Sequence, residues 1–303
     1  MRHRANLILE FWDRSRELTL ENLHYKKFVT KFYNFLLNED AGLGDITTDS
    51  MIKKNEKILA KIVAKENGVA AGLEELEFLN QDLELRRLKN DGDKIYGGDV
   101  LAEMEGQSKK ILERERTSLN FLQRMSGIAT LTNTINKNLG GNIKVAATRK
   151  TLWGSIDKKA VSVGGGITHR LNLSDGILIK DNHLGILQFD MEKALKSAIG
   201  RSRYVEIEVE NKKDALRAAK IIRKLGSSSL FAIMFDKIRP ITIKSIIKEL
   251  KMEDFYEHIL FEASGNITPK NLTDYSNCGV DIISMGCLTN SSKVLNMSQE
   301  IMR

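Results

Sequence analysis

The sequence predicts an α/β protein with one parallel sheet and a second, mostly antiparallel one. From about residue 143 onward, short β-branched apolar runs alternate with amphipathic segments, a pattern typical of parallel strands joined by helices. Before residue 108, apolar and polar positions alternate between Asn-Gly, Asp-Gly and Gly-Gly pairs, which indicates turns between antiparallel strands. Two differently built regions are therefore expected.

The second half of the chain contains six apolar runs that predict strands. They lie at residues 143–148, 176–179, 204–209, 230–235, 258–263 and 281–286, with helical patterns that include 211–226 and 240–250. A further run, AVSV at residues 160–163, adds a seventh strand if it is one. Since a complete α/β barrel has eight strands in roughly 250 residues, we expect an incomplete barrel. An open doubly wound sheet is the alternative.

The first half predicts strands within residues 57–72 and 83–106. Residues 108–138 predict one long helix, with Ile111, Leu122, Met125 and Ala129 along a single face. Arg116 falls between two leucines of this helix. Its side chain either lies along apolar surface with its guanidinium in water, or it reaches into a neighbour's pocket.

Composition and charge narrow the class of function. A net charge of +7 suits an anionic partner, but the basic residues are scattered among acidic ones, so we expect neither nucleic-acid nor membrane binding. No apolar run approaches the roughly 18 residues of a membrane span. Two cysteines, Cys278 and Cys287, are too few for a disulfide framework and favour the cytoplasm. Glu10 and Asp13 interrupt the first apolar patch, which argues against a cleaved signal.

Charged or small residues follow each predicted strand. In chain order they are Arg149 with Lys150, Lys180, Glu208 with Glu210, Asp236, Glu262 with Ser264, and Gly286. Since the loops after barrel strands converge on one mouth, we expect these residues to line one site. Arginine and lysine suit phosphate and carboxylate groups, while acidic side chains suit ribose hydroxyls or a divalent ion. The pattern predicts a substrate with several negative charges and a sugar.

Three consecutive glycines, Gly164 to Gly166, precede His169 and Arg170. We expect the bare backbone either to pass close to a ligand or to adopt conformations closed to other residues, with the two side chains beyond it as donors. Two later segments, EASGN at 262–266 and SMGCLTN at 284–290, carry small residues whose backbone N–H groups are suited to a phosphate.

Seven segments together resemble the quinolinate phosphoribosyltransferase family, also called the carboxylating nicotinate-nucleotide pyrophosphorylases. In the family's order they are EDAGLGDITT, ERTSLNFLQRMSGIATLT, ATRKT, GGGITHRLNLSDGILIKDNH, EIEVEN, FEASGNI and DIISMGCLTNS, within about Lys26 to Ser292. The resemblance implies an N-terminal open-faced α/β sandwich followed by an incomplete α/β barrel. It sets residues 1–24 apart as an extension and gives a sandwich at 25–117, a barrel at 118–289, and a tail at 290–303 that packs back on the sandwich.

The resemblance also implies an activity. The enzyme would transfer the phosphoribosyl group of phosphoribosyl pyrophosphate to quinolinate, releasing pyrophosphate and CO2 and giving nicotinate mononucleotide for NAD biosynthesis. It implies Mg2+ and a cytoplasmic homodimer whose sites each take one arginine, matched by Arg116, from the other subunit; whether dimers assemble further stays open. The alternatives are a related transferase for nicotinate or another base, including the molybdenum-operon relative, and a noncatalytic nucleotide-binding protein.

Site residues follow from the same resemblance. Quinolinate would contact Arg116, Arg149, His169 and Arg170, and the phosphates or a carboxylate would contact Lys150 and Lys180. The ribose and its metal would contact Glu208 and Asp236. The remaining substrate contacts would come from Thr148, Ser264, Gly265, Asn266, Met285 and Gly286. Lys150, Lys180, Glu208 and Asp236 would be catalytic, with Mg2+ held mainly through pyrophosphate. Thr168 and Asn290 replace the family's common Asn and His, and we expect altered phosphate or carboxylate contacts from them.

Overall fold

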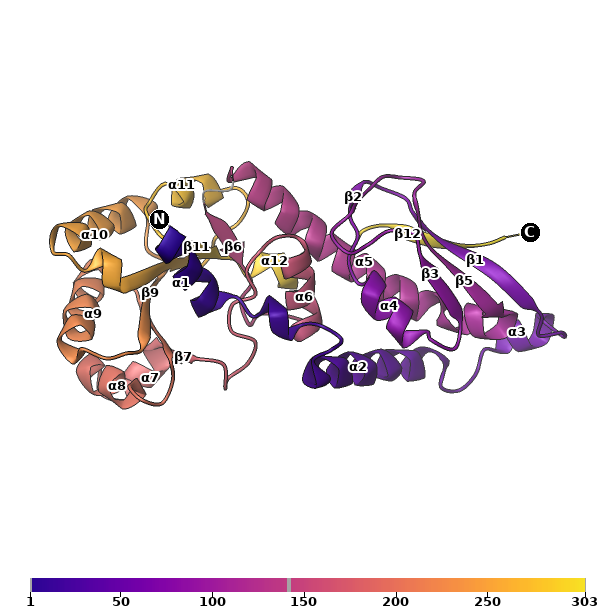
Figure 1. Ribbon diagram of the computed structural model, residues 1–303, viewed down its shortest axis with the longest axis horizontal. Helices are drawn as coiled ribbons and strands as arrows, with labels where there is room; N and C mark the ends of the chain where they lie inside the picture. The colour runs from indigo at the N-terminus through magenta and orange to yellow at the C-terminus, as the bar shows by residue number, and fades with distance from the viewer. Residues whose placement is uncertain (1, 141–142, 303) are drawn as a thin grey trace. The chain divides into compact units, whose positions relative to one another are not determined.

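The computed structural model describes residues 2–140 and 143–302, which form two compact units (Figure 1). The parallel-sheet unit comprises Met1–Arg14, Ile135–Thr151 and Gly166–Asn290. The antiparallel-sheet unit comprises Ser15–Thr134, Leu152–Gly165 and Ser291–Arg303. Residues 1–24, which the resemblance set apart as an extension, are thus divided between the two units.

Six parallel strands form the sheet of the parallel-sheet unit. In spatial order they are β6 (Lys144–Ala146), β11 (Ile282–Ser284), β10 (Ile259–Ser264), β9 (Leu230–Asp236), β8 (Tyr204–Val209) and β7 (Ile177–Ile179). The predicted α/β class and its six strands are confirmed. The edge strands β6 and β7 do not pair with each other in the part of the chain that is described, so the sheet is an incomplete barrel.

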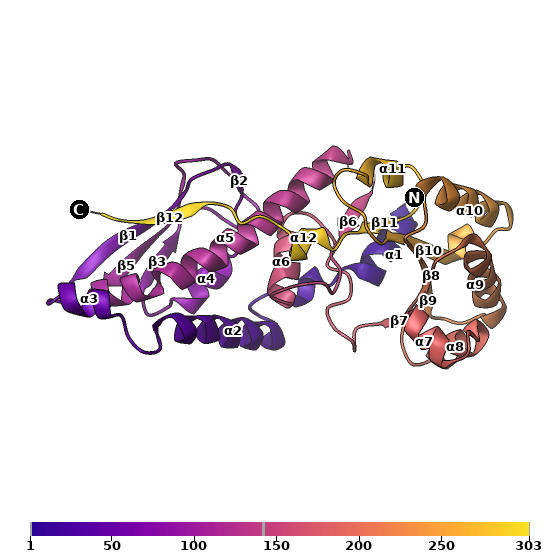
Figure 2. The ribbon, with the colours of Figure 1, turned by 180° about the vertical axis from the view of Figure 1, so that it is seen from behind.

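Helices follow the strands of this sheet, and α8, α9 and α10 lie along its outer side in both views (Figures 1 and 2). They are α7 (Asp181–Ile186), α8 (Met191–Ala198), α9 (Lys212–Leu225), α10 (Pro240–Met252), α11 (Leu272–Ser276) and α12 (Cys287–Asn290). The sequence sets their ends: the Asn211 side chain accepts the Asp214 N–H at the start of α9, and Gly226, with φ of 54°, ends it. Ala215, Ala219 and Ile222 bury one face of α9.

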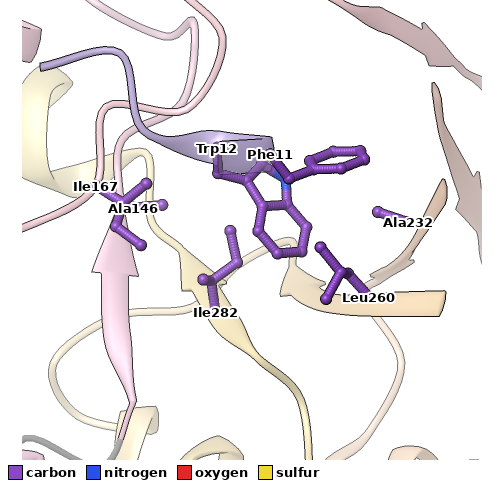
Figure 3. Packing of buried hydrophobic residues seen from close by; sticks show 7 residues of the cluster. All are labelled: Phe11, Trp12, Ala146, Ile167, Ala232, Leu260 and Ile282. Atoms are coloured by element: carbon purple, nitrogen blue, oxygen red, sulfur yellow. The ribbon is translucent and has the colours of Figure 1, made fainter. Parts of the chain in front are cut away.

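The first helix, α1 (Arg2–Trp12), also belongs to the parallel-sheet unit. Its last two residues, Phe11 and Trp12, are buried among side chains of the sheet (Figure 3). The cluster comprises Phe11, Trp12, Ala146, Ile167, Ala232, Leu260 and Ile282. The start of the chain is therefore part of this unit's hydrophobic core.

The antiparallel-sheet unit has a four-stranded sheet of order β12-β1-β5-β3. Its strands are β1 (Lys57–Ala64), β3 (Glu84–Arg87), β5 (Val100–Gln107) and β12 (Met297–Ile301), with β2 (Gly68–Val69) and β4 (Lys94–Ile95) as a separate pair. Its helices are α2 (Leu23–Ala41), α3 (Ile46–Met51), α4 (Leu73–Leu79) and α6 (Ser155–Val163), together with most of α5 (Ser108–Asn138). The chain's last strand, β12, pairs with β1.

The predicted long helix is α5, and its expected apolar face is buried at Ile111, Leu122, Met125 and Ala129. The seventh strand was a wrong expectation, because residues 160–163 form the last turn of α6. Ile156, Ala160 and Val161 are buried at helical spacing, and this packing outweighs the β-branched character of the run. No helix within the described residues is both long enough and apolar enough for a membrane span.

Candidate active site

A cavity of about 700 Å³ opens at the carboxyl ends of the six parallel strands, a volume typical of small-molecule sites. The predicted residues that line it are Thr148, Arg149, Lys150, His169, Arg170, Lys180, Glu208, Asp236, Ser264, Gly265 and Asn266. Leu173, Gly176, Ile177, Leu178, His183, Met234, Lys237, Glu262 and Ser284 complete the wall. Groups from separate βα loops therefore share one cavity, as the strand-end pattern predicted.

Three of the residues that the resemblance assigned to the site do not line this cavity, and neither does Glu210 of the strand-end set. Met285 is fully buried, and its backbone N–H donates to the carbonyl of Ala146, 3.0 Å away. Gly286 lies just behind the wall, where an added Cβ would sit 3.4 Å from Lys150 Cδ. Arg116 is an exposed residue of α5 in the antiparallel-sheet unit. Their roles stay predictions.

The turn after β6 exposes two cations. The Lys150 N–H donates to Thr148 Oγ1 at 3.1 Å, and the Thr289 hydroxyl donates to the Lys150 carbonyl at 2.9 Å, so the turn's backbone is held from two sides. The Arg149 and Lys150 side chains pair with no carboxylate among the described residues. Burial, and then the neighbouring Arg149 guanidinium, lower the pKa of Arg170. This wall has excess positive charge that suits an anionic ligand.

Each of the two predicted acids on the opposite strands is paired with a lysine of the described chain. Lys180 Nζ lies 2.5 Å from Glu208 Oε2, and Lys237 Nζ lies 2.8 Å from Asp236 Oδ2. Gly265 follows β10 with φ of 86°, and an added Cβ would lie 2.5 Å from Asp236 Oδ1. Only glycine fits this position, because both its backbone conformation and the adjacent carboxylate exclude a side chain.

Below the mouth, His169 contacts two buried carboxylates. Its Nε2 lies 2.9 Å from Glu262 Oε2 and 3.4 Å from Glu206 Oε2. Glu206 was absent from the predicted set, and Glu262 was noted only as a strand-end residue. The alternation of β8 could have identified Glu206, since residues two apart on a strand share a face and Glu208 was already assigned to the site.

The buried acids affect one another and the imidazole. Burial and the charge of Glu262 raise the pKa of Glu206 to about 7. Burial opposes charge on His169, but Glu262 and Glu206 outweigh it and raise the pKa of His169 to about 9. The Arg170 N–H donates to His169 Nδ1 at 2.8 Å, which requires that nitrogen to be unprotonated. A pKa of about 9 would protonate both ring nitrogens at neutral pH, whereas this hydrogen bond needs Nδ1 without a proton, so the bond opposes the charge that the two carboxylates favour. The geometry supports the neutral ring, with its proton on Nε2, facing the acids.

Two sequence expectations near His169 were wrong, contact of the glycine triplet with a ligand and contact of Thr168 with the substrate. The alternative role of the triplet is confirmed at Gly165, whose φ of 84° is closed to most other residues. None of Gly164 to Gly166 lines the cavity; Gly164 ends α6, and an added Cβ would lie 2.5 Å from the Ala129 carbonyl oxygen of α5. Close helix packing therefore explains this glycine. Thr168 is fully buried and does not face the cavity. Its Oγ1 accepts the Arg14 N–H at 2.7 Å, so the substitution at this position contacts the start of the chain.

Comparison with known proteins identifies the family. Residues 128–300 match the C-terminal domain of quinolinate phosphoribosyl transferase, and residues 45–126 match its N-terminal domain. The chain belongs to the quinolinate phosphoribosyl transferase family. Both halves of the chain carry the match, which confirms the resemblance inferred from the seven segments.

Individual relatives of this family cover most of the chain. A Methanothermobacter thermautotrophicus protein named "Probable nicotinate-nucleotide pyrophosphorylase (carboxylating)" is 38% identical over 275 residues, which are 88% of this chain and 96% of the relative. The Nicotiana glauca protein named quinolinate phosphoribosyltransferase (decarboxylating) 2, mitochondrial, is 37% identical over 285 residues, 88% of this chain and 80% of the relative. The crystal structure of NadC from Streptococcus pyogenes has a TM-score of 0.80 and 31% identity, covering 90% of this chain and 96% of that one.

Proposed function

We propose that the protein transfers the phosphoribosyl group of phosphoribosyl pyrophosphate to quinolinate, forming nicotinate mononucleotide, pyrophosphate and CO2 for NAD biosynthesis. The observation that carries the proposal is the shared cavity, in which Arg149, Lys150 and Arg170 face Glu208 and Asp236. A dicarboxylate requires cations, and a ribose requires acceptors for its hydroxyls. The names of the family and of its relatives support the same reaction.

The cavity supplies the groups that the chemistry needs. Quinolinate would lie against Arg149, His169 and Arg170, with its ring nitrogen directed at the anomeric carbon of the sugar. Departure of pyrophosphate leaves positive charge on the ribose, and Glu208 and Asp236 would stabilise that charge in the transition state. Lys150 and Lys180 would neutralise phosphate or carboxylate oxygens. Loss of CO2 leaves a carbanion beside the positively charged ring nitrogen, which stabilises it until a proton from water bonds to that carbon and completes nicotinate mononucleotide.

Mg2+ is part of the proposal. Glu208 and Asp236 offer oxygen ligands of the kind Mg2+ prefers, so the donor set fits the ion. Among the described residues neither acid belongs to a cluster of three ligand side chains, which favours an ion held mainly by the substrate's pyrophosphate. The bound ion would neutralise charge that develops on the departing pyrophosphate.

We also propose a homodimer with shared active sites, and the support comes from exposed residues of the antiparallel-sheet unit. The Arg116 side chain is 60% exposed, and among the described residues its ion pair is with the adjacent Glu115, 3.7 Å away. Arg116 lines a shallow hollow together with Asp45 and Ile46. Ile46 and nearby Leu43 are highly exposed apolar residues, and such residues beside an exposed arginine are typical of an interface hot spot. The proposed partner is a second copy of the chain, with Arg116 donated to its cavity.

A cytoplasmic location completes the proposal. Its support is the free state of Cys278 and Cys287, since a reducing compartment keeps thiols unpaired. Fractionation of the native source, with the protein followed by antibody, tests this location. Recovery in a membrane or secreted fraction would contradict it.

The activity test is direct. The purified chain is incubated with quinolinate, phosphoribosyl pyrophosphate and Mg2+, and nicotinate mononucleotide and CO2 are measured. We expect both products from quinolinate and little turnover of nicotinate, because a monocarboxylate leaves part of the cationic wall unpaired. Preference for nicotinate would favour a related transferase. Steeply salt-dependent binding of RNA or DNA, unchanged by Lys150→Ala and without product formation, would favour a noncatalytic binder.

A further inference from the structure

The start of the chain packs against the parallel sheet from the amino ends of its strands, opposite the end where the cavity opens. Arg4 pairs with Asp281 at 2.7 Å, just before β11, and donates to the carbonyls of Tyr256 and Ile259, at the amino end of β10. Phe11 and Trp12 then enter the core between the strands (Figure 3). The cavity opens at the carboxyl ends of these strands.

One buried carboxylate connects this segment to the site. The Trp12 Nε1–H donates to Glu206 Oε1 at 3.3 Å, and the other oxygen of Glu206 lies 3.4 Å from His169 Nε2. Trp12 and Glu206 are almost completely buried, so water does not reach this bond easily. Removing the indole N–H leaves a buried carboxylate oxygen without that donor, which is costly and favours a rearrangement of the carboxylate.

A second set of bonds holds the backbone around His169. The Arg14 N–H donates to Thr168 Oγ1 at 2.7 Å. The Arg14 Nε–H donates to Asp175 Oδ1 at 2.8 Å, and the other oxygen of Asp175 accepts the Leu171 N–H at 2.9 Å. The same segment of chain therefore binds residues on both sides of His169 and Arg170.

His169 has an unusual backbone conformation that the bonds around it help to maintain. Its φ is 55°, a value that is uncommon outside glycine and costs free energy unless the surroundings enforce it. The ring is thereby directed at Glu206 and Glu262, while the next residue, Arg170, faces the cavity. A small loss of order here would change the direction of both side chains.

We propose that Trp12 and Arg14 are positioning residues of the active site, which hold His169 and Arg170 in the orientation that binds the carboxylates of quinolinate. The inference rests on the proposed function, and it gives the start of the chain a role beyond filling the core. Phe11 provides the matched control, because it is buried in the same cluster and its side chain has no polar group. Loss of packing alone would affect Phe11 and Trp12 variants alike.

The experiment compares Trp12→Phe with Phe11→Leu in the full chain. Thermal unfolding measures packing, and steady-state kinetics give the KM of each substrate and kcat. Both variants should lower the melting temperature. Only Trp12→Phe should raise the KM for quinolinate, by about fivefold to tenfold, the scale of one buried hydrogen bond. The KM for phosphoribosyl pyrophosphate should stay within about twofold of the parent, since the bond of Trp12 reaches no residue that is assigned to that substrate.

The outcomes separate the positioning role from the activity itself. A parent enzyme that makes no nicotinate mononucleotide overturns the proposed function. An active parent with an unchanged quinolinate KM in Trp12→Phe, or with equal changes in both variants, overturns the positioning role alone. If Trp12→Phe does not fold, Arg14→Met decides the question, because methionine keeps the apolar part of the side chain and has no donor for Asp175. It should raise the quinolinate KM selectively, and an unselective or absent effect counts against the proposal.

Discussion

Lys180 Nζ and Glu208 Oε2 lie 2.5 Å apart across the mouth of the cavity. The pair connects the ends of neighbouring strands β7 and β8. A substrate that uses the carboxylate for its ribose and the ammonium for a phosphate or carboxylate must separate the two groups. The ion pair therefore keeps each group in place until the substrate's own charges replace the partner.

Replacing Glu208 tests its role at the transition state. Glu208→Gln keeps the shape of the side chain and removes its charge, so we expect kcat to fall by about 10²- to 10³-fold, the scale found for removing one electrostatic stabiliser. Folding should be preserved, because the side chain lies at the mouth. Steady-state kinetics and circular dichroism check both statements. Glu210→Gln is the control, since Glu210 is exposed and does not line the cavity. A similar fall in kcat for Glu210→Gln would contradict a specific role of Glu208 at the transition state.

Arg116 permits a test of site sharing. Arg116→Ala and Lys150→Ala should each abolish most of the activity in homodimers. After the two inactive proteins are mixed and exchange subunits, each mixed dimer regains one intact site, and random exchange returns about a quarter of the parent activity. Activity is measured before and after exchange, with each variant incubated alone as the control. No recovery after exchange, with subunit exchange verified by mass-tagged chains, would mean that each site is built within one chain.

Local sequence patterns predicted much of this fold. The six strand runs and the face formed by Ile111, Leu122 and Met125 follow from the periods of strand and helix. The strand-end rule then predicted a common site containing Arg149 and Glu208, because parallel strands bring their carboxyl ends together. These features depend on residues close in the chain, or on one rule of topology.

Contacts between distant residues were the part that the sequence did not disclose. Trp12 and Glu206 are 194 positions apart, and no local pattern indicates that an indole near the start contacts a strand in the middle. The helical state of residues 160–163 was missed for the same reason, because tertiary burial of Ala160 and Val161 overrides the strand preference of the run. Thr168 was expected to alter a substrate contact because it replaces the family's common Asn, whereas its Oγ1 accepts the Arg14 N–H.

Replacing Gly265 by any other residue should lower both stability and activity. In Gly265→Ala, the Cβ would meet Asp236 Oδ1 at 2.5 Å, and φ of 86° would be strained as well. We expect a stability loss of about 1–3 kcal/mol and a larger relative loss of activity, because Asp236 must move. Gly200→Ala is the control: its φ is 74°, but nothing lies within 4 Å of the added Cβ. Urea unfolding and kinetics of both variants check this, and full activity of Gly265→Ala would contradict it.

Glu75 predicts a pH dependence of stability in the antiparallel-sheet unit. The side chain is fully buried; Tyr25 donates to its Oε1 at 2.9 Å, and its Oε2 has no hydrogen-bond partner in the described part of the chain. Burial, and then the charge of Asp91, raise the pKa of Glu75 from 4.5 to about 7. Between these values the folded chain holds a proton that the unfolded chain releases. The contribution of Glu75 to the free energy of unfolding therefore falls as pH rises from 4.5 to 7, by at most on the order of 3 kcal/mol.

Glu75→Gln removes this titration while keeping the size of the side chain. Relative to the parent, the variant should gain stability between pH 5 and pH 8, measured as the difference in urea unfolding midpoint at each pH. Glu74→Gln is the control, because Glu74 lies in the same helical turn with its side chain 36% exposed, and its difference from the parent should change little over this range. A Glu75→Gln difference that stays constant with pH would mean that the buried carboxyl is already ionised in the folded chain at pH 5. The adjacent Lys159, 4.0 Å from Glu75 Oε1, would then be the group that holds its charge.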